Sequence, residues 1–269
     1  MAKPAKIKYE TIISEIFFRH YKGNGDDFVF ERNEIEEAAV KAGVDRPKNL
    51  GDVVYTYRHR RSLPKPILDT QPEGLHWLIL GAGDAKYRFR LSKLAYIEPT
   101  KGLLIRKIPD ATPEIIRKYA LSDEQALLAK IRYNRLIDTF LGITAFSLQN
   151  HLRTKIDNYG QIEIDELYVG VDTRGAQFVA PVQAKGGTDR LGVIQTIQDI
   201  VYCQSKETYS GCIVRPVSAQ FMSDETIAMF ELTFDGNDVS IMREKHYRLT
   251  NVDDIAKSDL DGYARDTLE

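Results

Sequence analysis

The first 93 residues alternate between helical and strand-like patterns of apolar positions. Apolar residues from Ile12 to Phe17 recur at the spacing of one helix face, and Asn33 followed by Glu36 is a helix-capping signal. The sequence Gly-Ala-Gly-Asp at positions 81–84 is typical of a hairpin turn. The predicted elements are a helix over 9–22, a strand over 28–30, a helix from 33 to 43, a helix from about 48 to 60, and strands over 75–80 and 87–91.

The rest of the chain has a mixed pattern of helices and strands. Residues 94–111 have the pattern of a strand and a connector, and Thr112-Pro113-Glu114 begins a helix because proline is favoured at the first helical position. Ser122 and Gln125 fit a capping box that opens the longest predicted helix, which ends before Gly142. The remaining predictions are a helix over 145–156, strands over 161–171 and 177–187 joined by a turn at 172–175, and a helix over 192–203.

These patterns predict an α/β protein in three parts. Residues 1–93 form a first domain, residues 94–250 form a second domain with a sheet and flanking helices, and residues 251–269 form an acidic tail. The tail contains six acidic and two basic residues, and we expect it to be partly disordered.

The order of the first six predicted elements is that of a winged-helix domain, whose third helix enters the major groove of DNA. Residues 1–93 carry 17 basic and 13 acidic residues, although the whole chain has a net charge of −2. A local excess of positive charge suits a polyanionic partner, but it also fits the solvated C-terminal end of a helix. The predicted DNA-binding residues, in and around the third helix, are Arg46, Lys48, Tyr57, Arg58, Arg60, Arg61 and Lys65.

The composition excludes several classes of protein. Cys203 and Cys212 form no C-x-x-C motif, which argues against a thiolate zinc site and a disulfide framework. No apolar run approaches the roughly 20 residues that a membrane span needs, and the start of the chain lacks the apolar segment of a signal peptide. We expect a soluble, cytoplasmic protein with no membrane partner.

Polar residues interrupt two otherwise apolar predicted strands, at positions that a hairpin brings together. The first strand carries Glu163, Asp165 and Glu166. The second carries Gln183 and Lys185 directly after an apolar run, and both lie on one face of that strand because side chains alternate. The pattern predicts an acidic cluster beside a lysine, although a solvated polar face of the hairpin is the plainer alternative.

This constellation resembles the PD-(D/E)xK nuclease superfamily, whose members have the restriction-endonuclease-like fold. Asp165 matches the Asp on one strand of the family's hairpin. Gln183-Ala184-Lys185 matches its (Asp/Glu)-x-Lys motif, with Gln where a carboxylate is usual. Gln198 and Tyr202, one helical turn apart, resemble the Q-x-x-x-Y motif of one branch. The resemblance covers about residues 123–235. It implies a mixed sheet flanked by helices and cleavage of double-stranded DNA, as by a type II restriction endonuclease.

The chemistry of these residues fits phosphodiester hydrolysis. Mg²⁺ would neutralise charge on the phosphate and activate water, and it is satisfied by one or two carboxylates, the phosphate and several waters. In this interpretation Lys185 orients the attacking water or stabilises the developing charge. The remaining assignments are Asp165, the Gln183 amide oxygen and the Ala184 carbonyl as metal ligands, Glu163 or Glu166 as the acid that compensates for Gln183, and Gln198 and Tyr202 as supports.

Two alternatives to restriction remain open at this point. Because Gln183 is neutral, the domain could be an inactive nuclease that only binds DNA. Alternatively, the chain could be a repair or recombination nuclease. The resemblance also implies a homodimer, since one active site cuts two strands poorly. A cognate DNA methyltransferase encoded nearby is a further expected partner.

Overall fold

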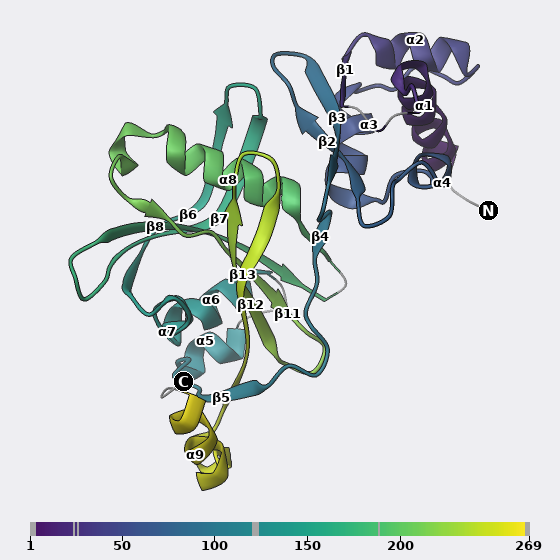
Figure 1. Ribbon diagram of the computed structural model, residues 1–269. Helices are drawn as coiled ribbons and strands as arrows, with labels where there is room; N and C mark the ends of the chain where they lie inside the picture. The colour runs from purple at the N-terminus through teal and green to yellow at the C-terminus, as the bar shows by residue number, and fades with distance from the viewer. Residues whose placement is uncertain (1–3, 24, 26, 120–123, 188, 267–269) are drawn as a thin grey trace.

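The computed structural model describes residues 4–266 apart from residues 24, 26, 120–123 and 188. It contains a sheet of eight strands beside a smaller assembly of helices and strands (Figure 1). Helices make up 34% of the chain and strands 35%, so the prediction of a mixed α/β protein is confirmed. We call residues 4–92 the N-terminal lobe and residues 93–266 the body.

The N-terminal lobe has the predicted elements in the predicted order, with one additional short helix, α4, before the last two strands, and its three-stranded sheet has the order β1-β3-β2. Asn33 does not cap the second helix through its side chain; instead Glu34 Oε1 accepts a hydrogen bond of 2.8 Å from the Glu31 amide. The elements are α1 (Pro4–His20), β1 (Phe28–Glu31), α2 (Glu34–Lys41), α3 (Gly51–Tyr55), the π-helical turn η1 (Thr56–Arg60), α4 (Lys65–Leu68), β2 (His76–Gly81) and β3 (Lys86–Ser92).

An aromatic cluster forms the core of the lobe. The ring of Phe17 on α1 meets the rings of Trp77 and Phe89 edge to face, at centroid distances of 5.3 and 5.1 Å. Tyr57 is buried in the same cluster. Because this cluster draws its members only from residues 9–91, the lobe has an apolar core of its own.

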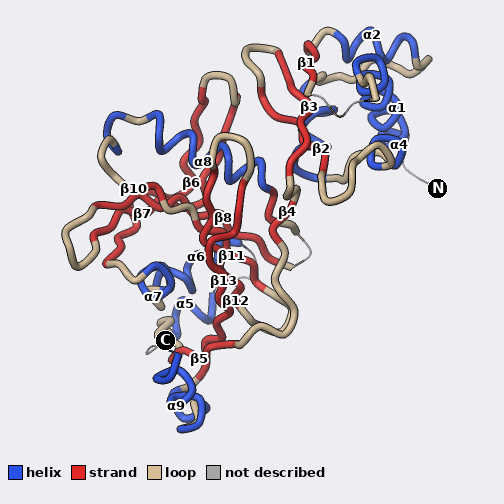
Figure 2. The backbone as a smooth tube through the Cα atoms, viewed as in Figure 1, coloured by secondary structure: helices blue, strands red, loops and turns tan. Residues whose placement is uncertain are grey.

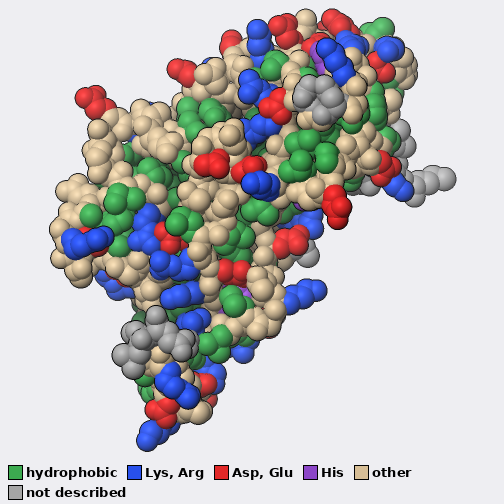
Figure 3. All heavy atoms as spheres, viewed as in Figure 1, with side chains coloured by type: hydrophobic (Ala, Val, Ile, Leu, Met, Phe, Trp, Pro, Cys, Tyr) green, Lys and Arg blue, Asp and Glu red, His purple; other side chains and the backbone are tan. Residues whose placement is uncertain are grey.

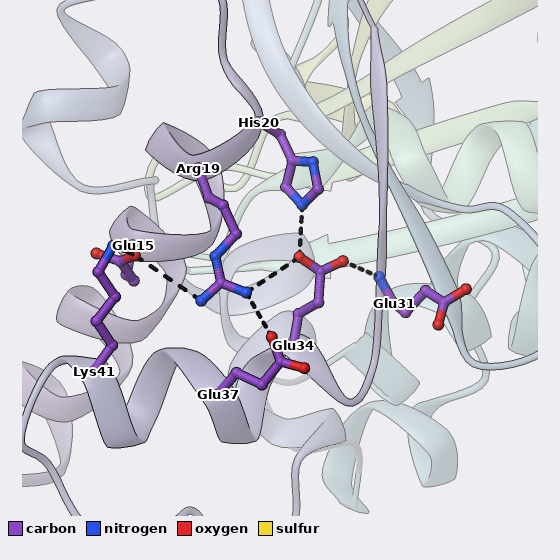
Figure 4. Close-up of polar contacts among 7 residues, drawn as sticks. All are labelled: Glu15, Arg19, His20, Glu31, Glu34, Glu37 and Lys41. Atoms are coloured by element: carbon purple, nitrogen blue, oxygen red, sulfur yellow. Dashed lines mark hydrogen bonds and ion pairs between the residues drawn. The ribbon is translucent and has the colours of Figure 1, made fainter.

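A network of charged side chains joins α1 to α2 on the outside of this core (Figure 4). Arg19 pairs with Glu37 at 2.7 Å, and His20 Nε2 lies 2.6 Å from Glu34 Oε2. Each of these charged groups has a partner within the network, so the network serves to hold the two helices together.

The body is built on a mixed sheet in the order β5-β13-β12-β11-β8-β7-β6, with short β10 also paired to β8. The pairs β8–β11, β8–β10 and β5–β13 are parallel, and the others are antiparallel. Figure 2 shows these strands gathered in the body, away from the helices of the lobe. Their bounds are β5 (Ile105–Pro109), β6 (Thr144–Ile156), β7 (Gly160–Val171), β8 (Gln177–Gly186), β10 (Ile213–Val214), β11 (Val217–Phe221), β12 (Ile227–Phe234) and β13 (Val239–Thr250).

Helices cover both faces of this sheet. Val182 of β8 packs in one apolar cluster with Leu128 of α6 and Phe140 of α7. Val179, on the other face of β8, packs with Tyr202 and Cys203 of α8. The other elements of the body are β4 (Tyr96–Ile97), α5 (Glu114–Tyr119), α6 (Glu124–Tyr133), α7 (Leu136–Leu141), β9 (Leu191–Gly192), α8 (Val193–Ser205), η2 (Glu207–Tyr209), η3 (Val252–Asp254) and α9 (Lys257–Asp266).

Two sequence predictions in the body are wrong. Residues 145–156 form strand β6 rather than a helix, because they pair along almost their whole length with β7. The predicted long helix is broken at Arg135, whose φ of 48° ends α6 and begins α7. The tail is folded in part: Lys107 of β5 pairs with Asp259 of α9 at 2.9 Å, so α9 packs against the sheet edge. The predicted cap at Ser122 lies outside the described residues.

No helix in the described part of the chain is long and apolar enough to span a membrane.

Candidate active site

Strands β7 and β8 separate at the point where the predicted polar residues begin. Their ladder runs from the pair Val171–Gln177 to the pair Glu166–Val182 and does not continue beyond it. On the far side of this point, Asp165 Oδ2 accepts a hydrogen bond of 2.8 Å from the Ala184 amide. A side chain thus replaces the missing strand partner, and Asp165 is drawn against β8.

Gln183 is held in one orientation by two acceptors. Its Nε2 donates to the carbonyl oxygen of Glu163 and to Asp199 Oδ2, both at 2.8 Å. The Glu163 carbonyl oxygen can only accept a hydrogen bond, so Nε2 rather than Oε1 must face it. The Gln183 Oε1 atom is buried and has no hydrogen-bond partner in the described part of the chain.

Lys185 is the charged end of this group. Its Nζ lies 2.8 Å from Glu124 Oε1 at the start of α6, and its side chain is only 17% exposed. Burial opposes the charged form, but the hydrogen bond to Glu124 and the charges of Asp165 and Asp189 outweigh it and raise the pKa of Lys185. Lys185 therefore stays protonated at neutral pH and can act as a fixed positive charge.

Two acids beside this lysine have raised pKa values. Burial raises the pKa of Asp165, and the charges of Glu124 and Glu163 add to this, against the Ala184 hydrogen bond and the charge of Lys185. Complete burial raises the pKa of Asp199 well above its ordinary value, and the charge of Asp165 raises it further. Both carboxyl groups would gain from a nearby cation.

The other two predicted acids have cations of their own. Glu166 is completely buried and pairs with Arg132 Nε of α6 at 2.8 Å. Glu163 is half-exposed, pairs with Arg153 at 3.0 Å and lies 3.7 Å from His151. Glu163 reaches the cleft described below, whereas Glu166 does not.

The two predicted support residues on α8 separate. Gln198 is buried, lines the cleft and donates to the Tyr159 carbonyl oxygen at 3.2 Å. Tyr202, one turn further along, lies in the apolar cluster with Cys203 and stacks under the Lys206 ammonium group. The structure therefore brings Gln198 to the site and makes Tyr202 part of the core.

A cleft of about 890 Å³ lies in front of Lys185, between the body and the N-terminal lobe. The lobe contributes the end of its third helix, including Tyr55, His59, Arg60 and Arg61. Burial, followed by the charges of Arg58, Lys185 and Arg60, lowers the pKa of His59 to about 3. His59 is therefore neutral at physiological pH, and the positive charge of the lobe faces the site through its arginines. The body contributes Glu124, Glu163, Lys185, Asp189, Arg190 and Gln198.

The predicted DNA-binding residues do not form one surface. Arg60 and Arg61 line the cleft, and Arg60 lies over the Tyr55 ring at 4.9 Å. Tyr57 is a core residue of the lobe. The remaining four lie elsewhere: Arg58 is half-buried with its pKa lowered to about 10 by burial, Arg46 pairs with Glu36, and Lys48 and Lys65 are exposed outside the cleft.

Another concentration of Lys and Arg is visible over α7 and the β7–β8 turn (Figure 3). Arginines in this region are used within the fold. Arg215 and Arg243 donate to the carbonyl oxygens of Leu141 and Phe140 at the end of α7, and Arg215 also pairs with Glu231. Positive groups at a helix C-terminus interact favourably with the helix dipole, so the fold itself accounts for these two arginines.

The residues at the site offer a divalent cation two oxygen ligands, so waters, and in the substrate complex a phosphate, would complete its coordination. Among the described residues, no group of three or more His, Cys, Asp or Glu side chains could hold a metal alone. Asp165 supplies one carboxylate, and the unpartnered Gln183 Oε1 supplies a neutral oxygen. Mg²⁺ accepts such a set because it keeps several waters and binds substrate phosphates.

Sequence reasoning missed Asp199 and His59 of this site. Asp199 lies in the predicted helix, but nothing in the helical pattern marks it as facing β8. His59 is marked only by its basic surroundings, whereas Glu124 on the long predicted helix is a possible extra metal ligand from the sequence, and the structure pairs it with Lys185. Each is brought to the site by contacts between segments that are distant in the chain.

No protein-family model, curated protein or solved structure matches the chain. The site is therefore interpreted from its own geometry.

Proposed function

We propose that the protein is a Mg²⁺-dependent endonuclease of double-stranded DNA, with a restriction-endonuclease-like body and a winged-helix-like lobe. The observation that carries this proposal is the separation of β7 from β8, which gathers Asp165, Gln183 and Lys185 behind a cleft with arginines on its opposite wall. A buried acid and an amide oxygen beside a held lysine suit hydrolysis of a phosphodiester.

Each residue has a role that follows from its contacts. Asp165 and Gln183 Oε1 would hold Mg²⁺, which when bound would lower the pKa of water and neutralise phosphate charge. Lys185, protonated and fixed by Glu124, orients the attacking water and stabilises the charge that develops on the phosphate. Arg60 and Arg61 face the same cleft and bind the phosphates of the strand.

The remaining expectations follow from this proposal and are part of it. An enzyme that cuts both strands with one such site in each chain acts as a homodimer. An enzyme that cuts DNA at a specific sequence needs a methyltransferase that protects the host, and it acts in the cytoplasm, where that DNA is found.

The first test is cleavage of methylated and unmethylated phage DNA with Mg²⁺ or with EDTA. We expect discrete fragments that require Mg²⁺ and disappear in Lys185→Ala, while Lys101→Ala, which removes an exposed lysine outside the cleft, cuts like the parent. Cleavage by Lys185→Ala at the parent rate would refute the site. Cleavage of flap or cruciform DNA alone would favour a repair or recombination nuclease.

DNA binding in EDTA separates the proposal from an inactive nuclease. We expect Arg60→Ala and Arg61→Ala each to weaken binding and to reduce the slope of log affinity against log salt by about 1, while Arg46→Ala leaves both unchanged. Binding that depends on these arginines without cleavage of any substrate would support a DNA-binding protein whose neutral Gln183 leaves it inactive.

A further inference from the structure

Asp199 is an acid that the fold buries at unusual cost. It lies in the middle of α8, is 2% exposed and meets the sheet at Gln183. A buried carboxyl group without full hydrogen bonding destabilises a protein relative to an apolar residue of similar size. Asp199 Oδ1 has no hydrogen-bond partner among the residues that the structure describes, so packing alone does not explain this acid.

The partner of Asp199 is the residue at which the site lacks a carboxylate. Gln183 stands where a charged ligand would be expected, and Asp199 Oδ2 accepts its Nε2 at 2.8 Å. The Glu163 carbonyl oxygen accepts the same nitrogen from the other strand. Two acceptors on one nitrogen turn the Gln183 oxygen away from both of them.

The two acids closer in sequence are not available for this role. Glu166 is paired with Arg132, and Glu163 is paired with Arg153. Among the described residues Asp199 has no ion pair with a Lys or Arg side chain, and its carboxyl group hydrogen-bonds to Gln183 alone. We therefore expect the acid that compensates for Gln183 to lie on α8 rather than on β7.

We propose that Asp199 is a positioning residue that holds Gln183 so that its amide oxygen faces a divalent cation on Asp165, and that the Gln183–Asp199 pair replaces a carboxylate on β8. This inference rests on the proposed nuclease function. In this arrangement the acid lies on helix α8 instead of strand β8, and the Gln183 amide links it to the site.

The test measures Mn²⁺ binding by electron paramagnetic resonance, with no DNA present. Asp199→Leu removes the acceptor, and we expect its dissociation constant for Mn²⁺ to rise about 10- to 100-fold, as for other residues that orient metal ligands. Asp199→Asn keeps an acceptor oxygen and should lose less. Binding by a folded Asp199→Leu that equals the parent would overturn the inference.

An exchange of the two groups keeps the test decisive if Asp199→Leu does not fold. Gln183→Glu alone places two acids in contact and removes the donor to the Glu163 carbonyl oxygen. The double variant Gln183→Glu/Asp199→Asn loses the same donor but restores one acid and one amide in opposite order. We expect the double variant to bind Mn²⁺ more tightly and to unfold at a higher temperature than Gln183→Glu. Equal affinity in the two variants would contradict the pairing.

Asp165→Asn distinguishes failure of this inference from failure of the proposed function. If Asp165→Asn loses Mn²⁺ binding while Asp199→Leu retains it, only the role of Asp199 is wrong. If both variants bind Mn²⁺ like the parent, the cation does not bind at this site, and the proposed nuclease mechanism is wrong as well.

Discussion

The two halves of the β7–β8 pair have opposite characters. From Glu166 to Val171, β7 is paired with β8 residue by residue, and the side chains of β8 between Phe178 and Val182 are buried and apolar. Beyond this ladder the strands separate, and the buried side chains include Asp165, Gln183 and, on the facing helix, Asp199. Where strands stop pairing, backbone groups need side-chain partners, so polar residues become buried without a loss of order.

The difference teaches that the fold and the site are supported by neighbouring segments of the same strands. The paired half should govern stability, and the separated half should govern chemistry. Four substitutions, with two further ones as controls, test this division.

The largest expected effect is on chemistry in the separated half. Asp165→Asn keeps an acceptor for the Ala184 amide but removes the carboxylate, so we expect the rate of Mg²⁺-dependent cleavage to fall about a thousandfold, equivalent to several kcal/mol. Its midpoint of urea unfolding should stay near that of the parent. A variant that cleaves normally, or that fails to fold, would contradict the idea that the separated half governs chemistry rather than stability.

The next largest effect concerns the boundary residue Glu166. Arg132→Ala leaves this completely buried carboxylate without its cation. We therefore expect the free energy of unfolding to fall by about 3–5 kcal/mol. Glu166→Gln is the matched control and should cost less, because Arg132 is 37% exposed and can reach water. Both should bind Mn²⁺ like the parent. Loss of Mn²⁺ binding by Glu166→Gln would assign Glu166 to the site.

A comparable loss of stability is expected within the ladder. Leu167 pairs with Pro181 and is completely buried, so Leu167→Ala should lower the free energy of unfolding by about 2–5 kcal/mol. Below its unfolding transition, the variant should cleave at the parent rate. A large loss of rate in the folded variant would show that the ladder also sets the geometry of the site.

The last effect is a dependence of stability on pH at Asp199, which is small for each pH unit. Its pKa is raised in the folded protein, so above pH 3.8 the folded state holds a proton that the unfolded chain has lost. Compared with Asp199→Asn, the parent should lose stability as pH rises from 4, by at most about 1.4 kcal/mol per pH unit. Urea unfolding at pH 4, 5, 6 and 7 measures this difference.

Asp172 provides a control in which stability should depend on pH in the opposite direction. Burial works against its charge, but hydrogen bonds from Arg174 and Ala176 outweigh it and lower the pKa of Asp172. Its contribution is present above pH 3.8 and lost as pH falls below, so the parent should gain stability over Asp172→Asn as pH rises through this range. The same direction for both variants would contradict the assignment of Asp199.

Local patterns were sufficient for much of the fold. The apolar runs and turn residues of β7 and β8, and the helical period of α8, predicted these elements to within two residues. Strand β6 was mistaken for a helix because its apolar residues at 145, 148, 152 and 156 are three or four apart. Its pairing with β7 decides its conformation, and periodicity does not report such pairing.

The site was predicted in part for the same reason. Asp165, Gln183 and Lys185 follow from the hairpin, which is local in sequence. Asp199 and Glu124 depend on how α8 and α6 dock on the sheet, and no short-range pattern encodes this. Glu166 was ambiguous because the separation of the strands begins beside it, so neighbouring acids point to different partners.

The wide turn at the end of the third helix of the lobe sets the helical register of its last residues. The Arg61 amide donates to the Thr56 carbonyl oxygen, five residues back, at 2.8 Å. In a regular α-helix, residues three and four after Tyr57 would share its buried face, and these are Arg60 and Arg61. The extra residue in the turn rotates them away from the core and into the cleft. Deleting one residue between 56 and 60 would therefore change the direction of both arginines without altering any side chain in the body.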